Sequence, residues 1–309
     1  MSVSIAATTA AAQADESAII GSIRKSETAE ALVADWRPST DSEQYVTVHW
    51  PAAHGFYALP DGTYSPLLFG ESVRQAALVL THTVFDIPLS HRMSWQYLRS
   101  TSDPAALHRT GGDSTVELRM RHTHVKRRAG GTIHLTTQVT AVREGRDLGT
   151  AELRYSAYPP AIYDRLRGSH ADAQQVFDHA LPLSPALPPA AVGRVTERDV
   201  VLSAGRPPHH WRLRADTTHR VLFDHAHDHI PGMVLLEAAS QAAHACAAPR
   251  RVVPFDFEAT FFRYVELDQP CWITATPLDC GDGGHGRIRV DGYQGDAPVF
   301  SVTTESAAV

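Results

Sequence analysis

Two glutamates are candidate catalytic groups because each sits in an almost wholly apolar run with the composition of a buried helix. Glu71 lies in PLLFGESVRQAA, and Glu237 lies in PGMVLLEAASQAA. Gln75 and Gln241 follow one helical turn later, so each glutamine should share a helical face with its glutamate. A carboxylate buried without a partner costs several kcal/mol or shifts its pKa upward. The pattern predicts either a structural hydrogen bond or acid–base chemistry at both positions.

Acid–base chemistry would suit this setting. Burial is expected to raise the pKa of a glutamate in an apolar helix toward neutrality, where it can act as a general base. We therefore take Glu71 and Glu237 as candidate catalytic residues.

The similarity between the two helices extends to the segments before them, in the same order. The lead-in Ile23, Arg24 and Lys25 precedes the strand-like EALVADW, and Val192, Gly193 and Arg194 precede the strand-like DVVLS. An aromatic and histidine segment then leads into each helix. It contains His54 in the first half and, in the second, three histidines at alternate positions: His225, His227 and His229.

Strand signals follow each helix and define the fold class. Alternating apolar residues occur in MSWQYLRS, STVELRMRHTHV, GTIHLTTQVTAV and GTAELRYSAY in the first half, and in FDFEATFFRYV, CWITATPL, GRIRVDGY and APVFSVTTES in the second. A helix that is apolar all round is buried best when an antiparallel sheet curls around it. This is the hot dog architecture, so we predict an α+β double hot dog.

The domain boundaries follow from composition. Residues 1–20 lack the basic and apolar regions of a secretory signal and are predicted to be a mobile tail. Residues 21–160 form the first hot dog unit and 191–309 the second. Prolines in the intervening 161–190 predict a linker, because proline is excluded from central strands and helix interiors.

Composition favours small-molecule chemistry. The 309 residues carry a formal net charge of -6, which gives no overall attraction to nucleic acid or anionic membranes. No apolar run approaches the ~18 residues that span a bilayer. The three cysteines form neither a CxxC pair nor an even set, which favours a reduced, cytoplasmic setting.

These motifs resemble a known family. DHIPGMVLLEAASQAA is similar to the helix signature of hot dog dehydratases that act on acyl carrier protein substrates. The pairing of a PLLxxExxRQA helix with a DHxPGMxLLEAxxQA helix, together with the VGR and DVVLS lead-in, resembles the A-factor biosynthesis (AfsA) family of γ-butyrolactone and butenolide signal synthases. The resemblance runs from about Ile23 to the C-terminus.

The resemblance implies an acyltransferase. It would join a β-ketoacyl chain from acyl carrier protein to a hydroxyl of dihydroxyacetone phosphate or a similar three-carbon phosphate. Ring closure would then give a butenolide phosphate, the precursor of a γ-butyrolactone-type autoregulator of secondary metabolism. We expect no cofactor, no metal, no nucleic acid and no membrane partner. The acyl chain length and branching stay open.

One departure from the family pattern concerns the second helix. The family often has arginine three residues after the glutamate in both halves; here Arg74 follows Glu71, but Ser240 follows Glu237. An arginine at this spacing can hold a carboxylate or phosphate in a fork. Three explanations of the missing arginine stay open: the phosphate is held elsewhere, the two sites have diverged, or the substrate differs from the usual substrate of the family.

From the fold we expect each site to lie between the units, with Glu71 facing the His225 loop and Glu237 facing His54. We therefore take His225 and His54 as further candidate catalytic residues. Acyl transfer also needs oxyanion donors, which free amides after Pro231 could supply. The expected substrate-binding residues are Arg74, Gln75, Gln241, Gly232 and His229. The three alternating histidines would share one face of an extended strand, as a metal site requires, but the hot dog resemblance explains the DHxPG motif without a metal.

The basic run LRMRHTHVKRR could bind an acidic carrier or its phosphopantetheine arm, or it could be a solvated turn between strands. Three alternative functions also stay open: a dehydratase or thioesterase acting on carrier-bound acyl chains, or a non-catalytic acyl-binding protein. A monomer is expected because one chain already supplies both units, and edge strands leave a homodimer open.

Overall fold

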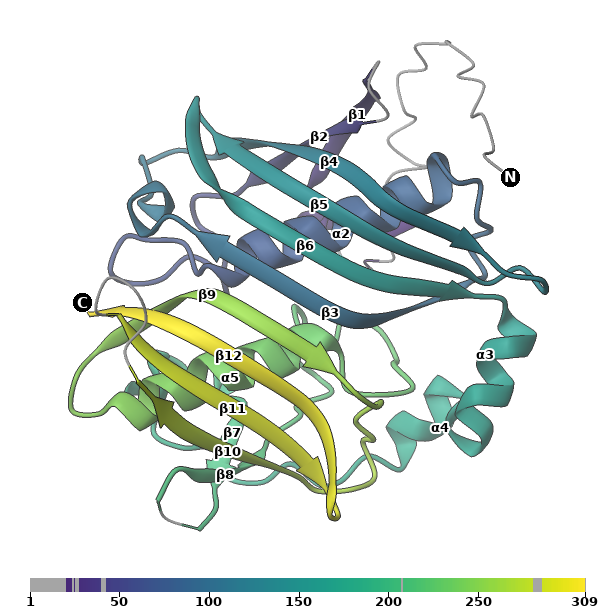
Figure 1. The fold of residues 1–309 in the computed structure, drawn as a ribbon. Coiled ribbons are helices and arrows are strands. Elements are labelled where there is room, and N and C mark those ends of the chain that lie inside the picture. The colour runs from purple at the N-terminus through teal and green to yellow at the C-terminus, as the bar shows by residue number, and fades with distance from the viewer. Residues whose placement is uncertain are drawn as a thin grey trace.

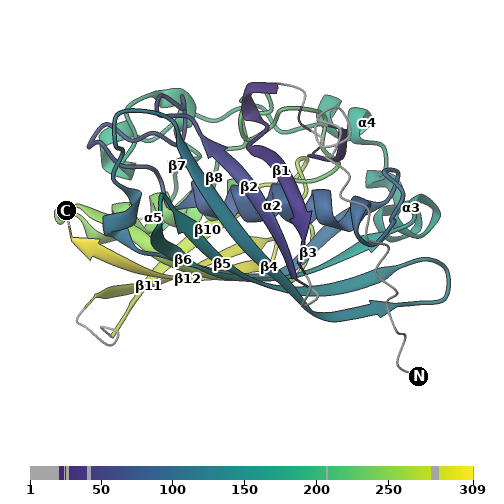
Figure 2. The ribbon, with the colours of Figure 1, turned by 90° about the horizontal axis from the view of Figure 1, so that it is seen from above.

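The computed structural model describes residues 21–23, 25, 28–39, 43–206, 208–279 and 285–308. The predicted tail, residues 1–20, and Cys280 lie outside these ranges. Within them the chain forms one antiparallel twelve-stranded sheet in the order β1-β2-β4-β5-β6-β3-β9-β12-β11-β10-β8-β7. The sheet curls around two helices that lie on the same face (Figures 1 and 2). The prediction of an α+β double hot dog is confirmed.

The first unit places one long helix against six strands. Its helix is α2 (Leu67–Thr83), and its strands are β1 (Val33–Pro38), β2 (Glu43–Trp50), β3 (Arg92–Ser102), β4 (Ser114–Arg127), β5 (Ile133–Arg143) and β6 (Arg146–Tyr158). Nearly every side chain of α2 is buried, as its unbroken apolar sequence predicts. The strands alternate buried and exposed residues, most regularly in β5, because only one face of the sheet covers the helix.

The second unit repeats this plan. Its helix is α5 (Gly232–Ala247), and its strands are β7 (Leu202–Ala204), β8 (His210–Leu213), β9 (Val252–Phe261), β10 (Cys271–Leu278), β11 (Gly286–Gln294) and β12 (Ala297–Ala308). Each strand segment predicted after a helix is confirmed. β2 and β8 are additional, since both lie in stretches that the sequence analysis did not assign to strands.

The two units are joined edge to edge. β3 pairs antiparallel with β9, with Leu98 opposite Ala259 in the register, so the sheet continues from one unit to the next. Across this seam Thr101 Oγ1 donates to Asp256 at 2.5 Å and Tyr97 donates its hydroxyl hydrogen to Glu258 at 3.1 Å. α2 and α5 also contact each other, which brings the two glutamate helices side by side.

The segment predicted as a linker has structure of its own. It contains α3 (Pro160–Arg167) and α4 (Ala173–Asp178), which lie beside the sheet between the two units (Figure 1). Pro160 takes the first position of α3, where its missing N–H leaves no hydrogen bond unmade. Short 3-10 turns at Thr28–Glu30, Pro104–Leu107, Gly168–His170, Pro189–Val192 and Glu197–Asp199 complete the regular elements. Among the described residues, no helix combines the length and hydrophobicity needed to cross a membrane.

Candidate active site

The first glutamate is buried and fully bonded. Glu71 is 3% exposed. Arg74 donates from Nε and Nη2 to its two oxygens at 2.7 Å each, and Gln75 donates at 2.8 Å. Lys25 Nζ lies 3.6 Å from the same carboxylate. The side-chain oxygen of Gln75 accepts from the Leu32 amide at 2.7 Å, which ties this group to the segment entering β1.

The second glutamate has a similar environment, but among the described residues it is bound by one cation in place of two. Glu237 is 1% exposed and accepts from Gln241 at 2.6 Å. Arg194 donates to both of its oxygens, from Nε at 2.8 Å and from Nη2. The Val201 amide donates to Gln241 at 3.0 Å. Glu237 therefore has a cation although Ser240 replaces the arginine of the family pattern.

The two lead-in cations are related by the internal repeat and cross between the units. Lys25 donates to the backbone oxygen of Val221, in the second unit, at 3.1 Å. Arg194 donates from Nη1 to the backbone oxygen of Phe56, in the first unit, at 3.0 Å. Each cation thus joins the glutamate of its own unit to the chain of the other, and the second unit differs by having no counterpart of Arg74.

The surrounding charges keep Glu71 ionised. Burial acts to raise the pKa of Glu71, but the charges of Arg74 and Lys25 and the hydrogen bonds from Arg74 and Gln75 outweigh it and lower the pKa to about 2. The expectation that this pKa would rise toward neutrality is wrong, because the helix sequence alone shows the burial and not all of the partners. A carboxylate so strongly stabilised is a weak base at neutral pH.

His54 has a structural counterpart in His219. Nδ1 of each ring accepts from the amides two and three residues further on, at 3.2 and 3.3 Å in His54 and at 3.3 and 3.1 Å in His219. Nε2 lies 3.4 Å from Glu30 in the first unit and 3.2 Å from Asp199 in the second. Each imidazole therefore braces a turn against the segment entering the sheet. The sequence analysis did not single out His219.

A cavity of about 460 Å³ lies where α2 meets the loop before α5. The first unit contributes Lys25, Glu71 and Arg74 to its wall, and the second contributes the loop that carries the three histidines and the start of α5. Glu71 and the His225 loop thus line the same space. α3 closes one side through Tyr163, so the segment predicted as a linker also forms part of the wall.

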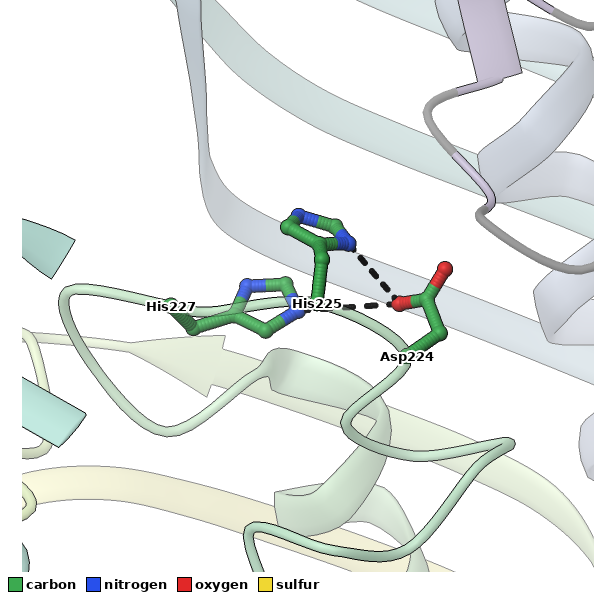
Figure 3. Close-up of side chains that lie close together, drawn as sticks. All are labelled: Asp224, His225 and His227. Atoms are coloured by element: carbon green, nitrogen blue, oxygen red, sulfur yellow. Dashed lines mark hydrogen bonds and ion pairs between the residues drawn. The ribbon is translucent and has the colours of Figure 1, made fainter. Parts of the chain in front are cut away.

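Inside this cavity Asp224 joins two histidines (Figure 3). Its Oδ1 is 3.0 Å from Nδ1 of His225 and 3.8 Å from Nε2 of His227. Burial acts to raise the pKa of Asp224, but the hydrogen bond from His225, the contact with His227 and the charge of Lys25 hold it far below its usual range. Burial lowers the pKa of His227 to about 4, so this ring is neutral at neutral pH.

The Asp224 contact fixes the role that His225 can play. With Nδ1–H donating to Asp224, Nε2 of His225 carries the lone pair of the neutral ring. The side chain of His225 is 41% exposed, so a substrate in the cavity can reach it. Donor atoms of Asp224, His225 and His227 lie within 4.8 Å of one another, and their types also suit a transition metal.

The three histidines lie in a loop and not in the extended strand that was expected, and all three line the first cavity. Nδ1 of His229 lies 3.0 Å from Asp228. Arg167 of α3 donates to Asp228 at 2.7 Å and to both oxygens of Glu266 at 2.7 Å each. Tyr163 donates to Asp228 at 2.8 Å. This buried network fixes the histidine loop to α3.

Gly232 lets α5 begin close to the sheet. A Cβ at this position would lie 3.1 Å from the ring of Trp95 in β3, a distance tighter than ordinary packing allows. The helix can therefore start at the cavity wall, where the amides of Gly232 and Met233 have no acceptors within the helix. Gly70 has no such neighbour, since a Cβ there would meet nothing within 4 Å.

A second cavity, of about 200 Å³, lies at Glu237. Its wall includes Arg194, Ser240, His244 and Arg251 from the second unit. Residues from Leu59 to Pro66 contribute the part that belongs to the first unit, and His54 is absent from the described wall. The second site is thus smaller and has no counterpart of the Asp224–His225 pair in its described lining.

The predicted site residues fall into three groups. Glu71, Arg74, His225, His229 and Gly232 line the first cavity, Glu237 lines the second, and Gln75, Gln241 and His54 brace the walls behind them. The sequence analysis assigned no role to Lys25, Arg194, Asp224, Tyr163 or Arg167. Only the first two had a signal, because the repeat places them at matching positions before the first strand of each unit.

Comparison with known proteins gives the family. The model of the A-factor biosynthesis hotdog domain matches residues 7–159 and 175–309. A 2-oxo-3-(phosphooxy)propyl 3-oxoalkanoate synthase of Streptomyces virginiae is 36% identical over 288 residues, covering 93% of this chain and 97% of that protein. One of the same name from Streptomyces coelicolor is 34% identical over 289 residues, covering 93% and 90%.

Solved structures share the fold at low sequence identity. A putative oleoyl thioesterase from Lactobacillus plantarum has a TM-score of 0.53 at 10% identity, covering 86% of this chain and 96% of the other. A pyran synthase domain from module nine of the sorangicin pathway has a TM-score of 0.51 at 12% identity, covering 90% and 97%. The two matched segments of the family model, together with relatives that align over nearly the whole chain, show that this protein belongs to the A-factor biosynthesis hotdog family.

Proposed function

We propose that this protein is an enzyme that makes a 2-oxo-3-(phosphooxy)propyl 3-oxoalkanoate, the ester of a β-ketoacyl group with dihydroxyacetone phosphate. The names of the two Streptomyces relatives support this activity. The observation that carries the proposal is the first cavity, where an Asp224–His225 pair and a Glu71–Arg74 pair face the same space. One pair supplies a base and the other supplies charge for binding.

His225 is the base in this reaction. Its Nε2 takes the proton of the acceptor hydroxyl while the hydroxyl oxygen attacks the thioester carbonyl carbon. The new C–O bond forms, the C–S bond breaks, and His225 returns the proton to the leaving sulfur. Asp224 holds the ring in the required tautomer and stabilises its protonated form. Glu71 positions Arg74 and takes no proton, because its pKa is about 2.

The start of α5 suits the developing negative charge. The attacked carbonyl oxygen becomes an oxyanion, and backbone amides aimed at it are effective stabilisers. The Val234 amide already donates to the Pro231 oxygen at 3.0 Å, but the amides of Gly232 and Met233 have no acceptor within the helix, and both residues line the cavity. The β-ketoester can then close its ring when C2, after losing a proton, attacks the ketone carbon of the acceptor moiety. Loss of water gives a butenolide phosphate.

We propose acyl carrier protein as the donor and the hairpin between β4 and β5 as part of its docking surface. Lys126, Arg127 and Arg128 are exposed there, and the carrier is expected to be acidic. A Cβ at Gly131, in the same turn, would lie 3.1 Å from Pro159, so the turn contacts the start of α3. Tyr163 and Leu166 of the same helix line the cavity, so α3 connects the hairpin to the cavity wall, which supports docking there (Figure 1).

One chain supplies both sides of the cavity, which supports a functional monomer, although the end strands β1 and β7 leave a homodimer open. We place the reaction in the cytoplasm. Cys246 and Cys271 are free, as expected where thiols stay reduced.

The test is to incubate the purified chain with a β-ketoacyl carrier protein, or the matching N-acetylcysteamine thioester, and dihydroxyacetone phosphate. Mass spectrometry should detect the phosphorylated ester or its butenolide, with one free thiol released per ester. Thiol release without ester would identify a thioesterase. A parallel reaction with a β-hydroxyacyl carrier protein, which can lose water, would identify a dehydratase if it gave the α,β-unsaturated acyl chain. Acyl binding without turnover would identify a binding protein.

A further inference from the structure

The two glutamate sites differ in their unused hydrogen-bond donors. In the second site every nitrogen of Arg194 has a partner, since Nε and Nη2 donate to Glu237 and Nη1 donates to the Phe56 backbone. In the first site the corresponding backbone bond is made by Lys25. Arg74 is therefore an additional cation, and among the described residues its Nη1 has no hydrogen-bond partner.

This nitrogen belongs to a side chain that lines the cavity. The side chain of Arg74 is 22% exposed, in contrast to 8% for Arg194. Glu71 holds Nε and Nη2, so the guanidinium plane is fixed before a ligand arrives. Lys25 lines the same cavity, and its ammonium, with three hydrogens, has capacity beyond the bond to Val221.

The two glutamates also differ in the number of cations that bind them. Glu71 has two cations, Arg74 and Lys25, whereas Glu237 has one, Arg194. The excess positive charge is at the first glutamate. Two further carboxylates line this cavity. Asp228 is paired with Arg167, whereas Asp224, which is bonded to His225, keeps a negative charge that offsets part of this excess. The second cavity has neutral Ser240 at the position that corresponds to Arg74.

We propose that Arg74 and Lys25 bind the phosphate of the acceptor, so that each chain holds one phosphorylated acceptor, in the first cavity. The proposal rests on the proposed function for the identity of the acceptor and adds the location and number of its phosphate sites. The hydroxyl of the same molecule then extends toward His225, which lines the same cavity. Glu71 acts as a positioning residue for the guanidinium.

The experiment measures acceptor binding apart from turnover. Calorimetric titration of the whole chain with dihydroxyacetone phosphate should give one site per chain, and dihydroxyacetone should bind at least about tenfold more weakly because it lacks the charged hydrogen bonds. Arg74→Met should weaken phosphate binding about ten- to hundredfold. Arg74→Lys, which keeps the charge without the fork, should lie between Arg74→Met and wild type.

Arg251→Met is the matched control, because Arg251 is an exposed cation of the second cavity. It should leave the affinity unchanged, and thermal unfolding would verify that each variant is folded. In turnover, Arg74→Met should raise KM for the acceptor more than KM for the thioester.

Failure of this inference is distinguishable from failure of the proposed function. Two sites per chain, no binding by wild type, or an Arg74→Met variant that binds as wild type does would overturn the phosphate site even if ester is made. Single-site binding that depends on Arg74, without any ester formed by wild type, would support the phosphate site and reject the synthase activity.

Discussion

Lys25 and Arg194 occupy equivalent places in the two units, and each binds a buried glutamate of its own unit and a backbone oxygen of the other. The two residues therefore join the two units in the interior, as the pairing of β3 with β9 joins them in the sheet. In the part of the chain that the structure describes, Arg194 is the one cation that binds Glu237, whereas Lys25 shares its glutamate with Arg74.

Replacing Arg194 should destabilise the fold. Arg194→Met leaves Glu237 buried without a cation, which we expect to cost about 3–5 kcal/mol of unfolding free energy. Arg194→Lys should recover part of the loss, because lysine performs this task in the first unit. Urea denaturation measures both variants, with Ser240→Ala as the control. Equal stability of Arg194→Met and wild type would show that Glu237 does not need the cation.

Removing the base should abolish turnover while the fold persists. His225→Ala should lower kcat about 10²- to 10⁴-fold, and Asp224→Asn should also lower it because the tautomer of His225 is no longer fixed. Ester formation is followed by mass spectrometry. His179→Ala, at an exposed position in the same part of the chain, serves as the control. A fully active His225→Ala variant would move the base elsewhere.

Arg167 should prove to be a positioning residue. Arg167→Met leaves Asp228 and Glu266 without their buried partner, so we expect a loss of about 3–5 kcal/mol in stability and a lower kcat from a displaced histidine loop. The comparison is Arg165→Met, which removes an exposed arginine from the same helix. Unfolding curves and kcat at saturating substrate test the two effects. An unchanged kcat in the folded variant would reject the positioning role.

Stability should fall in acid in a manner that depends on Glu71. The pKa of this carboxyl is about 2 in the folded chain, against an ordinary 4.5, so the unfolded chain binds its proton first. The contribution is complete above pH 4.5 and is lost as the pH falls through 2, with a change of about 2 kcal/mol between pH 6 and pH 3. Urea unfolding at both pH values should show a smaller pH effect in Glu71→Gln than in wild type. Identical pH effects would mean that Glu71 is not held ionised.

Charge reversal on the β4–β5 hairpin should affect only carrier-bound donors. Lys126→Glu with Arg128→Glu should raise KM for the β-ketoacyl carrier protein about tenfold or more and leave KM for the small thioester unchanged. Steady-state kinetics with the two donors compares them directly. A variant that uses the carrier as well as wild type does would reject this docking surface.

The sequence predicted the architecture because the fold depends on periodic patterns. Apolar helices around Glu71 and Glu237 and alternating strands such as Ile133–Arg143 leave few arrangements that bury both. The sequence predicted the contact partners of individual side chains less well. Arg167 meets Asp228 and Glu266 from distant parts of the chain, and no local pattern reports such contacts. For the same reason the low pKa of Glu71 did not follow from its apolar helix.

The continuous pairing of β3 with β9 in one chain has an evolutionary consequence. In a hot dog dimer built from two identical chains, every substitution appears in both sites at once. Here each unit has its own codons, so one site can lose a residue while the other keeps it. The two units already differ at equivalent helical positions, with Arg74 in the first and Ser240 in the second. Fusion in one chain thus allows the two sites to differ, as the cavities of about 460 Å³ and about 200 Å³ do.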